Sequence, residues 1–251
     1  MAGLIHSKQL KKQRDDYVNE VGDGLAAILK ATASSTSFTH IYKSTLALDS
    51  VLSFMVDDTK PSLLVVRESV RSCNFLVALH QPVLACIELR RVIEATFDCI
   101  YFADHPVEWR SLEDVGRVQI ESDSKQPIAY NACREPSFYA NYAKELFATE
   151  ISGLAKPASE FLSVKYSELS KDVHAKIHSS PSMSSMLDEM SAKKFASLSK
   201  LISGVYSRIL IVLAAKNVDK YNALPPVERE LSAWLIGEEN QNIISEKGIG
   251  F

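Results

Sequence analysis

Glycine and proline are scarce in this chain, with nine of each among 251 residues. Both residues interrupt helices and strands, so their scarcity favours long, unbroken elements. Alternation of apolar and polar residues never exceeds four positions, which leaves strands minor or absent. Apolar residues instead recur every three or four positions. The sequence therefore predicts one all-α domain over residues 1–237, a bundle of about eight helices, followed by a polar, flexible tail over 238–251.

Cysteines are also few, and none of the four stands in a C-x-x-C pair. This spacing argues against both a disulfide framework and a zinc site. Cys73, Cys86 and Cys99 fall in apolar stretches with helical periodicity, where a free cysteine behaves as a small buried hydrophobe. We therefore expect these three side chains in the core of a reduced protein.

Neither a strong charge of one sign nor a long apolar run is present. The net charge of −3 argues against a surface that coats nucleic acid, although it leaves a local basic groove open. The first residues lack the pattern of a signal peptide, and the most apolar run, residues 209–215, is too short to span a bilayer. These features predict a cytoplasmic protein with no membrane partner.

Helical periodicity and breaker residues give the helix boundaries. The predicted helices cover residues 3–32, 41–55, 61–77, 82–104, 136–151, 161–177, 193–215 and 225–237. Small polar residues at 31–40 predict a loop with an N-cap, and 117–135 is predicted as irregular. The helix at 82–104 is apolar almost all the way round, which places it at the centre of the bundle.

The common motifs of nucleotide binding, serine hydrolysis and zinc proteolysis are absent. One candidate constellation remains on the central helix, in ELRRVIEATFD. Arg90 and Glu94 form an i,i+4 pair on the same face as Tyr101. Because a charge pair on so apolar a helix is costly to bury, it needs partners beyond itself. It is either an ion pair that fixes how helices meet or a polar pocket that orients a catalytic or ligand-binding group.

A second candidate lies in the stretch YSELSKDVHAKIH, which ends the helix predicted at 161–177. His174 and His178 are four residues apart, so both could face one side of a helix, as two metal ligands need. The glutamate that related zinc motifs carry between their histidines is absent, so a metal site is not predicted. No cofactor is predicted either. His174 acting alone as acid, base or phosphate contact fits the pattern better.

Two segments together resemble HEPN-like helical bundles of bacteria. RRVIEATFDCIYFADHPVEWRSLE carries an Arg and a Glu on a central helix, then aromatic residues and a break before a charged stretch. YSELSKDVH matches the later Tyr-x-x-Leu-Ser-x-x-x-His pattern of those proteins. The resemblance implies a role in antiviral defence or as a toxin. Active members are metal-independent, dimeric ribonucleases, and other members serve as interaction modules.

In active HEPN-like nucleases four to six residues separate an Arg from the His that follows it, and this chain departs from that pattern. Lys171 stands before His178 with six residues between them, and lysine lacks the bidentate fork of arginine. A composite site could replace the motif if Arg90 or Arg91 approached His174 while Glu94 oriented the cation. The candidate catalytic residues are His174, Arg90, Glu94, Lys171 and His178. The candidate binding residues are Arg91, Tyr101 and Tyr166.

Three functions follow as expectations. The first is an HEPN-like defence or toxin protein, either a ribonuclease effector or an accessory subunit whose site has decayed. The second is a module for protein–protein interaction or dimerisation, and the third is a helical bundle that binds a small molecule. The expected partners are RNA, a second copy of the chain, or a protein from the same operon.

Overall fold

The computed structural model describes residues 2–55, 61–108, 136–148, 153–177 and 191–247. Every regular element in these ranges is an α-helix, which confirms the all-α prediction. The longer helices are α1 (Ala2–Ala33), α2 (Thr36–Met55), α3 (Pro61–Ala78), α4 (Pro82–Asp104), α7 (Pro136–Ala148), α8 (Ala155–Ile177) and α10 (Ala192–Lys216). The shorter ones are α11 (Val218–Asn222), α12 (Pro226–Ile236) and α13 (Glu238–Lys247). The number of helices in the whole chain stays a prediction.

Two helices, α4 and α10, lie at the centre of the bundle. α10 contacts α2, α4, α8 and α12, while α4 contacts α3, α7 and α8 as well. All side chains from Ile209 to Ala214 are buried, because this part of α10 is covered on every side. By length and composition α10 could cross a membrane, but 67% of the 18-residue apolar stretch that meets this test is buried inside the bundle. Its apolar character is therefore that of a core helix.

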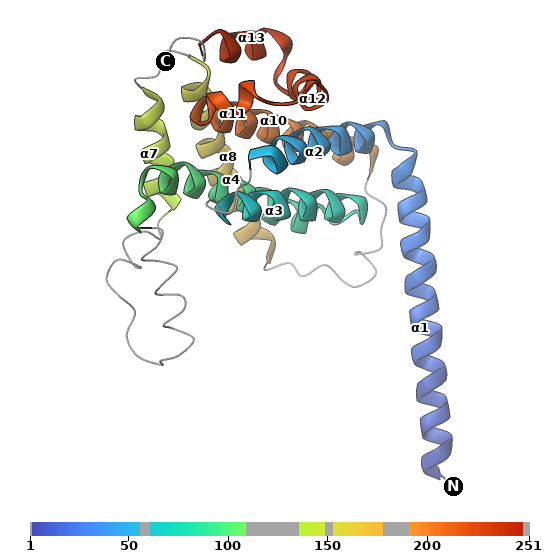
Figure 1. Cartoon of the computed structure of the whole chain (residues 1–251). Helices are drawn as coiled ribbons and strands as arrows, with labels where there is room; N and C mark the ends of the chain where they lie inside the picture. The colour runs from blue at the N-terminus through green and yellow to red at the C-terminus, as the bar shows by residue number, and fades with distance from the viewer. Residues whose placement is uncertain (1, 56–60, 109–135, 149–152, 178–190, 248–251) are drawn as a thin grey trace, which may run out of the picture.

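The long α1 does not join the bundle along its length. Figure 1 shows α1 projecting away from the other helices, which it meets only at its C-terminal end. Ile28 and Thr32, in the last turns of α1, are each 2% exposed. The hydroxyl of Thr32 donates a hydrogen bond to the carbonyl oxygen of Ala78 at 3.2 Å. These contacts fix the end of α1 on the bundle and leave the rest outside it.

Two helices begin earlier than the sequence predicted. The prediction that the second helix starts at residue 41 is wrong, since α2 begins at Thr36, where the Ser35 hydroxyl accepts a hydrogen bond from the Phe38 N–H at 3.3 Å. The small polar stretch therefore supplies the predicted N-cap but little loop. α8 begins at Ala155 rather than residue 161. Pro157 lies in its first turn, where a backbone N–H has no partner within the helix.

The C-terminal residues contain helical structure that the sequence did not predict. Gly237 ends α12 with φ 89°, in the left-handed region, as its predicted C-cap role requires. Residues 238–251 were predicted as a flexible tail, but Glu238–Lys247 form α13, and Ile244 is only 3% exposed. Two adjacent isoleucines in an otherwise polar segment give too weak a periodicity to predict such a helix.

The cysteines that the structure describes behave as core residues. Cys73 is fully buried and Cys99 is 7% exposed, while Cys86 is half-buried. Burial raises the pKa of the Cys73 thiol to about 12, so this thiol stays protonated and unreactive at neutral pH. Cys133 and the segment predicted as irregular, 117–135, lie outside the described residues.

Candidate functional site: a polar cluster between two helices

The Arg90–Glu94 pair of α4 meets Tyr166 of α8. Arg90 Nη2 donates a hydrogen bond to Glu94 Oε1 at 3.0 Å and another to the Tyr166 hydroxyl at 3.0 Å. That hydroxyl in turn donates to Glu94 Oε1 at 2.7 Å, which closes a triangle. The guanidinium carbon also lies 5.1 Å from the centre of the Tyr166 ring. Tyr166 is thus the additional partner that the sequence required for this ion pair. We call these three residues the polar cluster.

The polar cluster is partly shielded from water, and its charges reinforce one another. The Arg90 and Glu94 side chains are 26% and 30% exposed. Desolvation lowers the pKa of Arg90, but the hydrogen bond to Tyr166 and the charge of Glu94 outweigh it and raise the pKa overall. Burial and the hydrogen bond to Glu94 raise the pKa of the Tyr166 hydroxyl. At neutral pH Arg90 is therefore a cation and Tyr166 a neutral phenol.

One further carboxyl belongs beside the polar cluster, and the sequence did not single it out. Asp98 follows Glu94 by one turn of α4. Desolvation, with a smaller contribution from the Glu94 charge, raises its pKa to about 7. The i,i+4 row from Arg90 through Glu94 to Asp98 is visible in ELRRVIEATFD. The burial that raises the pKa of Asp98 depends on neighbouring helices, so the spacing in the sequence alone could not reveal the raised pKa.

The remaining candidates on α4 lie elsewhere. Arg91 is 60% exposed and lies 4.0 Å from Glu88, at the limit of an ion pair. Tyr101 is 5% exposed, its hydroxyl donates to Glu108 at 2.6 Å, and its ring stacks on His105 with centres 4.1 Å apart. Neither has a described bond to the polar cluster. Their predicted role as binding residues therefore stays a prediction.

The candidates on α8 are only partly described. Lys171 is exposed, five residues after Tyr166. His174 lies in α8 eight residues after Tyr166, which is about 12 Å along the helix axis at 1.5 Å per residue. The orientation of its side chain, and all of His178, lie outside the described residues. The predicted meeting of Arg90 with His174 therefore stays a prediction.

Around Tyr101, a second network of aromatic and charged side chains joins the C-terminal ends of α4 and α10 to the middle of α7. Asp104 accepts a hydrogen bond from the Tyr142 hydroxyl at 2.6 Å and another from Lys216 Nζ at 2.6 Å. Desolvation raises the pKa of Asp104, but these two hydrogen bonds outweigh it and lower the pKa overall. The network fits a structural role in holding these three helices together.

A histidine contact between α2 and α10 was also missed. His40 Nδ1 lies 2.9 Å from Ser203 Oγ, which lies 2.9 Å from Ser44 Oγ. A histidine beside a serine hydroxyl is the geometry of an activated nucleophile. However, Ser203 lies in the middle of α10, where backbone N–H groups are used by the helix and cannot stabilise an oxyanion. The contact is therefore assigned to helix packing.

The geometry of the polar cluster limits its chemistry. Arg90 Nη2 is already engaged by Glu94 and Tyr166, and the carboxyls of Glu94 and Asp98 would repel a phosphate. Arg90 Nε is buried and has no hydrogen-bond partner among the described residues. In the same part of the chain, no group of three or more His, Cys, Asp and Glu side chains is placed to hold a metal ion.

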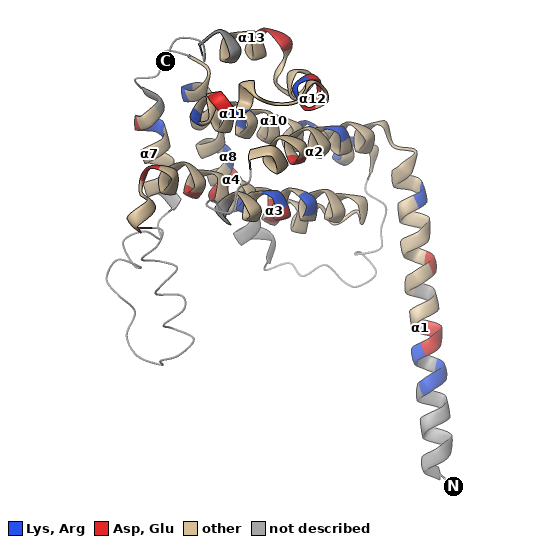
Figure 2. Ribbon diagram, in the orientation of Figure 1, with Lys and Arg blue, Asp and Glu red and all other residues tan. Residues whose placement is uncertain are grey.

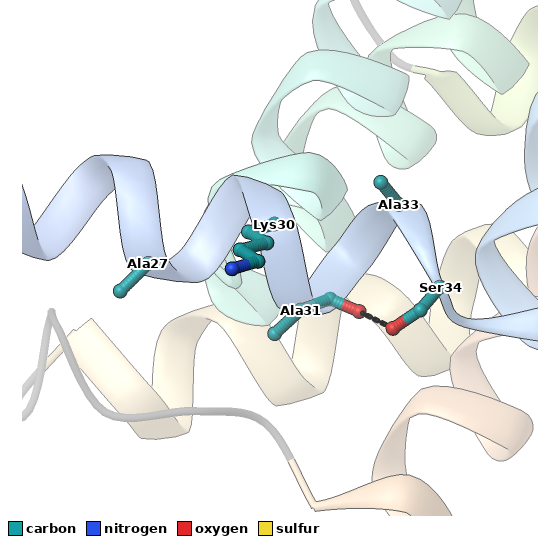
Figure 3. A pocket seen from close by; sticks show the side chains of 5 residues that line it. All are labelled: Ala27, Lys30, Ala31, Ala33 and Ser34. Carbon is teal, nitrogen blue, oxygen red and sulfur yellow. Dashed lines mark hydrogen bonds between the residues drawn. The ribbon is translucent and has the colours of Figure 1, made fainter.

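Two hollows on the described surface have no lining residue in the polar cluster. One, of about 650 Å³, is lined by α1 and the residue after it: Ala27, Lys30, Ala31, Ala33 and Ser34 (Figure 3). Another, of about 660 Å³, lies against α12 and α13 and includes Leu224 and Arg229. Because neither hollow includes the candidate site residues, the small-molecule alternative gains no support from them.

Comparison with known proteins leaves the chain without an assigned family. No family model matches it, and searches of curated proteins and of solved structures also found no match. The HEPN-like resemblance therefore rests on RRVIEATFDCIYFADHPVEWRSLE and YSELSKDVH alone, and it remains a prediction.

Proposed function

We propose that this chain is an HEPN-like, cytoplasmic helical bundle that acts as an accessory, protein-binding subunit of a bacterial defence or toxin-type system. In this proposal its nuclease site has decayed. The single observation that carries the proposal is the engagement of Arg90 by Glu94 and Tyr166. The residue that the resemblance offers as the phosphate-binding cation is instead a link between α4 and α8.

Releasing Arg90 to bind a phosphate would be costly. The Arg90–Glu94 ion pair at 3.0 Å and the Tyr166 hydrogen bond would both have to break. Glu94 would then remain beside the incoming phosphate as a like charge, and Asp98 would add a second one whenever it ionises. A ribonuclease needs a cation whose charge is available to the transition state. This cluster fits a structural role better.

A metal-independent ribonuclease remains the second candidate, and one observation favours it. Arg90 touches the same helix, α8, that carries His174 about two turns further on. RNA supplies its own nucleophile in the 2′-hydroxyl, so a positioned histidine and a cation could suffice for cleavage. This mechanism would need Arg90 to leave Glu94 when RNA binds.

An RNA cleavage assay separates the two candidates. The purified full chain is incubated with end-labelled single-stranded and hairpin RNA in the presence of a chelator. His174→Ala, Arg90→Ala and the control Lys156→Ala, an exposed cation in the first turn of α8, are assayed beside it. The accessory role predicts equal, background cleavage in all four samples. Cleavage by the wild type and Lys156→Ala that is lost in a folded His174→Ala variant would overturn the proposal, with folding checked by thermal unfolding.

The interaction role has its own test. The proteins encoded beside this chain are each co-expressed with it and passed through size-exclusion chromatography. The proposal expects one of them to co-elute with the chain in a fixed ratio. Failure of all neighbours to bind would contradict an accessory role within one operon.

A further inference from the structure

The N-terminal helix is too poorly covered to be stable by itself. α1 has 32 residues, so it is about 48 Å long, and only its last turns contact the bundle. Gly22 and Gly24 lie in its interior, where each glycine costs about 1 kcal/mol relative to alanine. Helices in water obtain most of their stability from packing of an apolar face. The N-terminal three-quarters of α1 therefore needs a partner.

Residues on one face of α1 recur at the spacing of a two-helix contact. Its positions alternate in steps of three and four: Lys11, Arg14, Val18, Val21, Leu25, Ile28 and Thr32. The last two are buried against the bundle at 2% exposure, whereas Val18 is 58% exposed. The apolar stripe that anchors α1 on the bundle thus continues outward as far as the exposed Val18, and the cations Lys11 and Arg14 follow it on the same face.

The charges of α1 separate into two blocks and indicate which partner would cover it. Residues 8–14 contain four cations and no acid, and residues 15–23 contain four acids and no cation. Figure 2 shows this reversal of charge along the described part of α1. The only ion pair described between the blocks joins the neighbours Arg14 and Asp15, whose side chains are 66% and 47% exposed. Surface pairs of this kind contribute little, so both blocks remain available to a partner.

A second copy of the same helix complements these blocks in one orientation only. In a parallel pair, Arg14 and Lys11 would face their own copies across the contact, cation against cation. In an antiparallel pair that crosses near Asp16, Arg14 lies level with Val18 of the other copy and Lys11 with Val21. Each cationic block then lies beside an acidic block, and this happens twice because the pair is two-fold symmetric. The overlap spans about 19 residues, from 7 to 25.

We propose that two copies of this chain associate through an antiparallel pair of α1 helices that crosses near Asp16. This inference rests on the proposed interaction role and names a second copy as one partner. The bundles then lie at opposite ends of the helix pair, so their other surfaces stay free for further partners. A membrane carrying anionic lipids is a poorer partner for α1, because its surface would repel the acidic block.

Charge-block reversal in the full chain tests the pairing. At low salt, analytical ultracentrifugation should give twice the chain mass of 27.8 kDa. Lys11→Glu/Lys12→Glu/Arg14→Glu should raise the dimer dissociation constant at least tenfold, because acids then face acids. Asp15→Lys/Asp16→Lys/Asp23→Lys should do the same with cations. An equimolar mixture of the two variants should restore the dimer. Lys30→Glu, exposed on α1 beyond the overlap, is the matched control and should change nothing.

Two results would overturn the pairing. A monomeric wild type excludes it, and so does a dimer that neither block reversal weakens. The second result would arise from an interface elsewhere or from a parallel pair. In a parallel pair like blocks already face each other, so reversing one block only replaces one repulsion with another. Thermal unfolding of the bundle checks that the variants fold. RNA cleavage is scored separately, so a monomer without nuclease activity would refute the pairing while leaving the accessory role standing.

Discussion

Replacing Asp98 with asparagine tests whether the side chain beside the polar cluster is held as a neutral acid. Its pKa is about 7 in the folded chain, against an ordinary value of 3.8. Between these values the folded protein keeps a proton that the unfolded chain has lost. Ionisation of Asp98 therefore weakens the fold as pH rises from about 4 to about 7, and the full cost persists above pH 7. The asparagine side chain of the Asp98→Asn variant cannot ionise, so the variant escapes this cost.

The size of the effect follows from the pKa difference. A shift of about three units at about 1.36 kcal/mol per unit gives an upper bound of about 4 kcal/mol. Water reaches the half-buried side chain and screens part of it, so we expect Asp98→Asn to be at least about 1 kcal/mol more stable than the wild type at pH 8. The two proteins should differ little in pH dependence below pH 4.

The assay is urea denaturation at half-unit steps from pH 4 to pH 8, followed by circular dichroism. The quantity of interest is the difference in unfolding free energy between Asp98→Asn and the wild type, which should grow with pH. Glu160→Gln, an exposed carboxylate on α8, is the control and should show no such growth. In a Glu94→Gln background the growth should end at a lower pH, because the Glu94 charge contributes to the raised pKa of Asp98. A difference that stays flat across this range would refute the reasoning.

Two further predictions concern the ion pairs. Arg90→Met should lower the unfolding free energy by about 1–2 kcal/mol, because it leaves Glu94 and Tyr166 without their cation in a half-buried contact. A fully buried pair would cost about 3–5 kcal/mol, and a silent variant would show that the contact does not form in solution. Lys216→Met should destabilise the fold by about 1 kcal/mol at pH 7 and by less as pH falls through the lowered pKa of Asp104. Chemical denaturation at pH 7 and pH 3 checks it, and an equal loss at both values would contradict the assignment.

The fold was largely predictable because its signals are local. Pro61 and Pro82 mark helix starts that the structure places at those residues, and Gly237 marks the end of α12. One error arose where a helix depends on its neighbours. α13 is anchored by Ile244, whose burial comes from other helices, and its own sequence is too polar to show a face. Periodicity predicts a helix only where apolar residues recur along one face of its own sequence.

The candidate site was predictable only in part. The i,i+4 spacing of Arg90 and Glu94, together with the apolar helix around them, correctly required another polar partner. The sequence could not identify that partner's position, because Tyr166 lies 72 residues beyond Glu94 and reaches it through the packing of α4 on α8. Asp98 illustrates the same limit, since its charge state depends on desolvation by the folded chain.

The charge state of Asp98 also bears on the choice between a structural and a catalytic polar cluster. If Asp98 were fully ionised, Arg90 would stand beside two carboxylates, and the half-buried α4–α8 contact would carry a net negative charge. With its pKa near 7, Asp98 is partly protonated at neutral pH, which brings the three groups closer to neutrality. A near-neutral contact stabilises the packing of two apolar helices, because it avoids an unpaired charge in a poorly solvated place. A phosphate-binding site needs the opposite, a surplus of positive charge. The partial protonation of Asp98 at neutral pH therefore supports a structural link between α4 and α8 at this position.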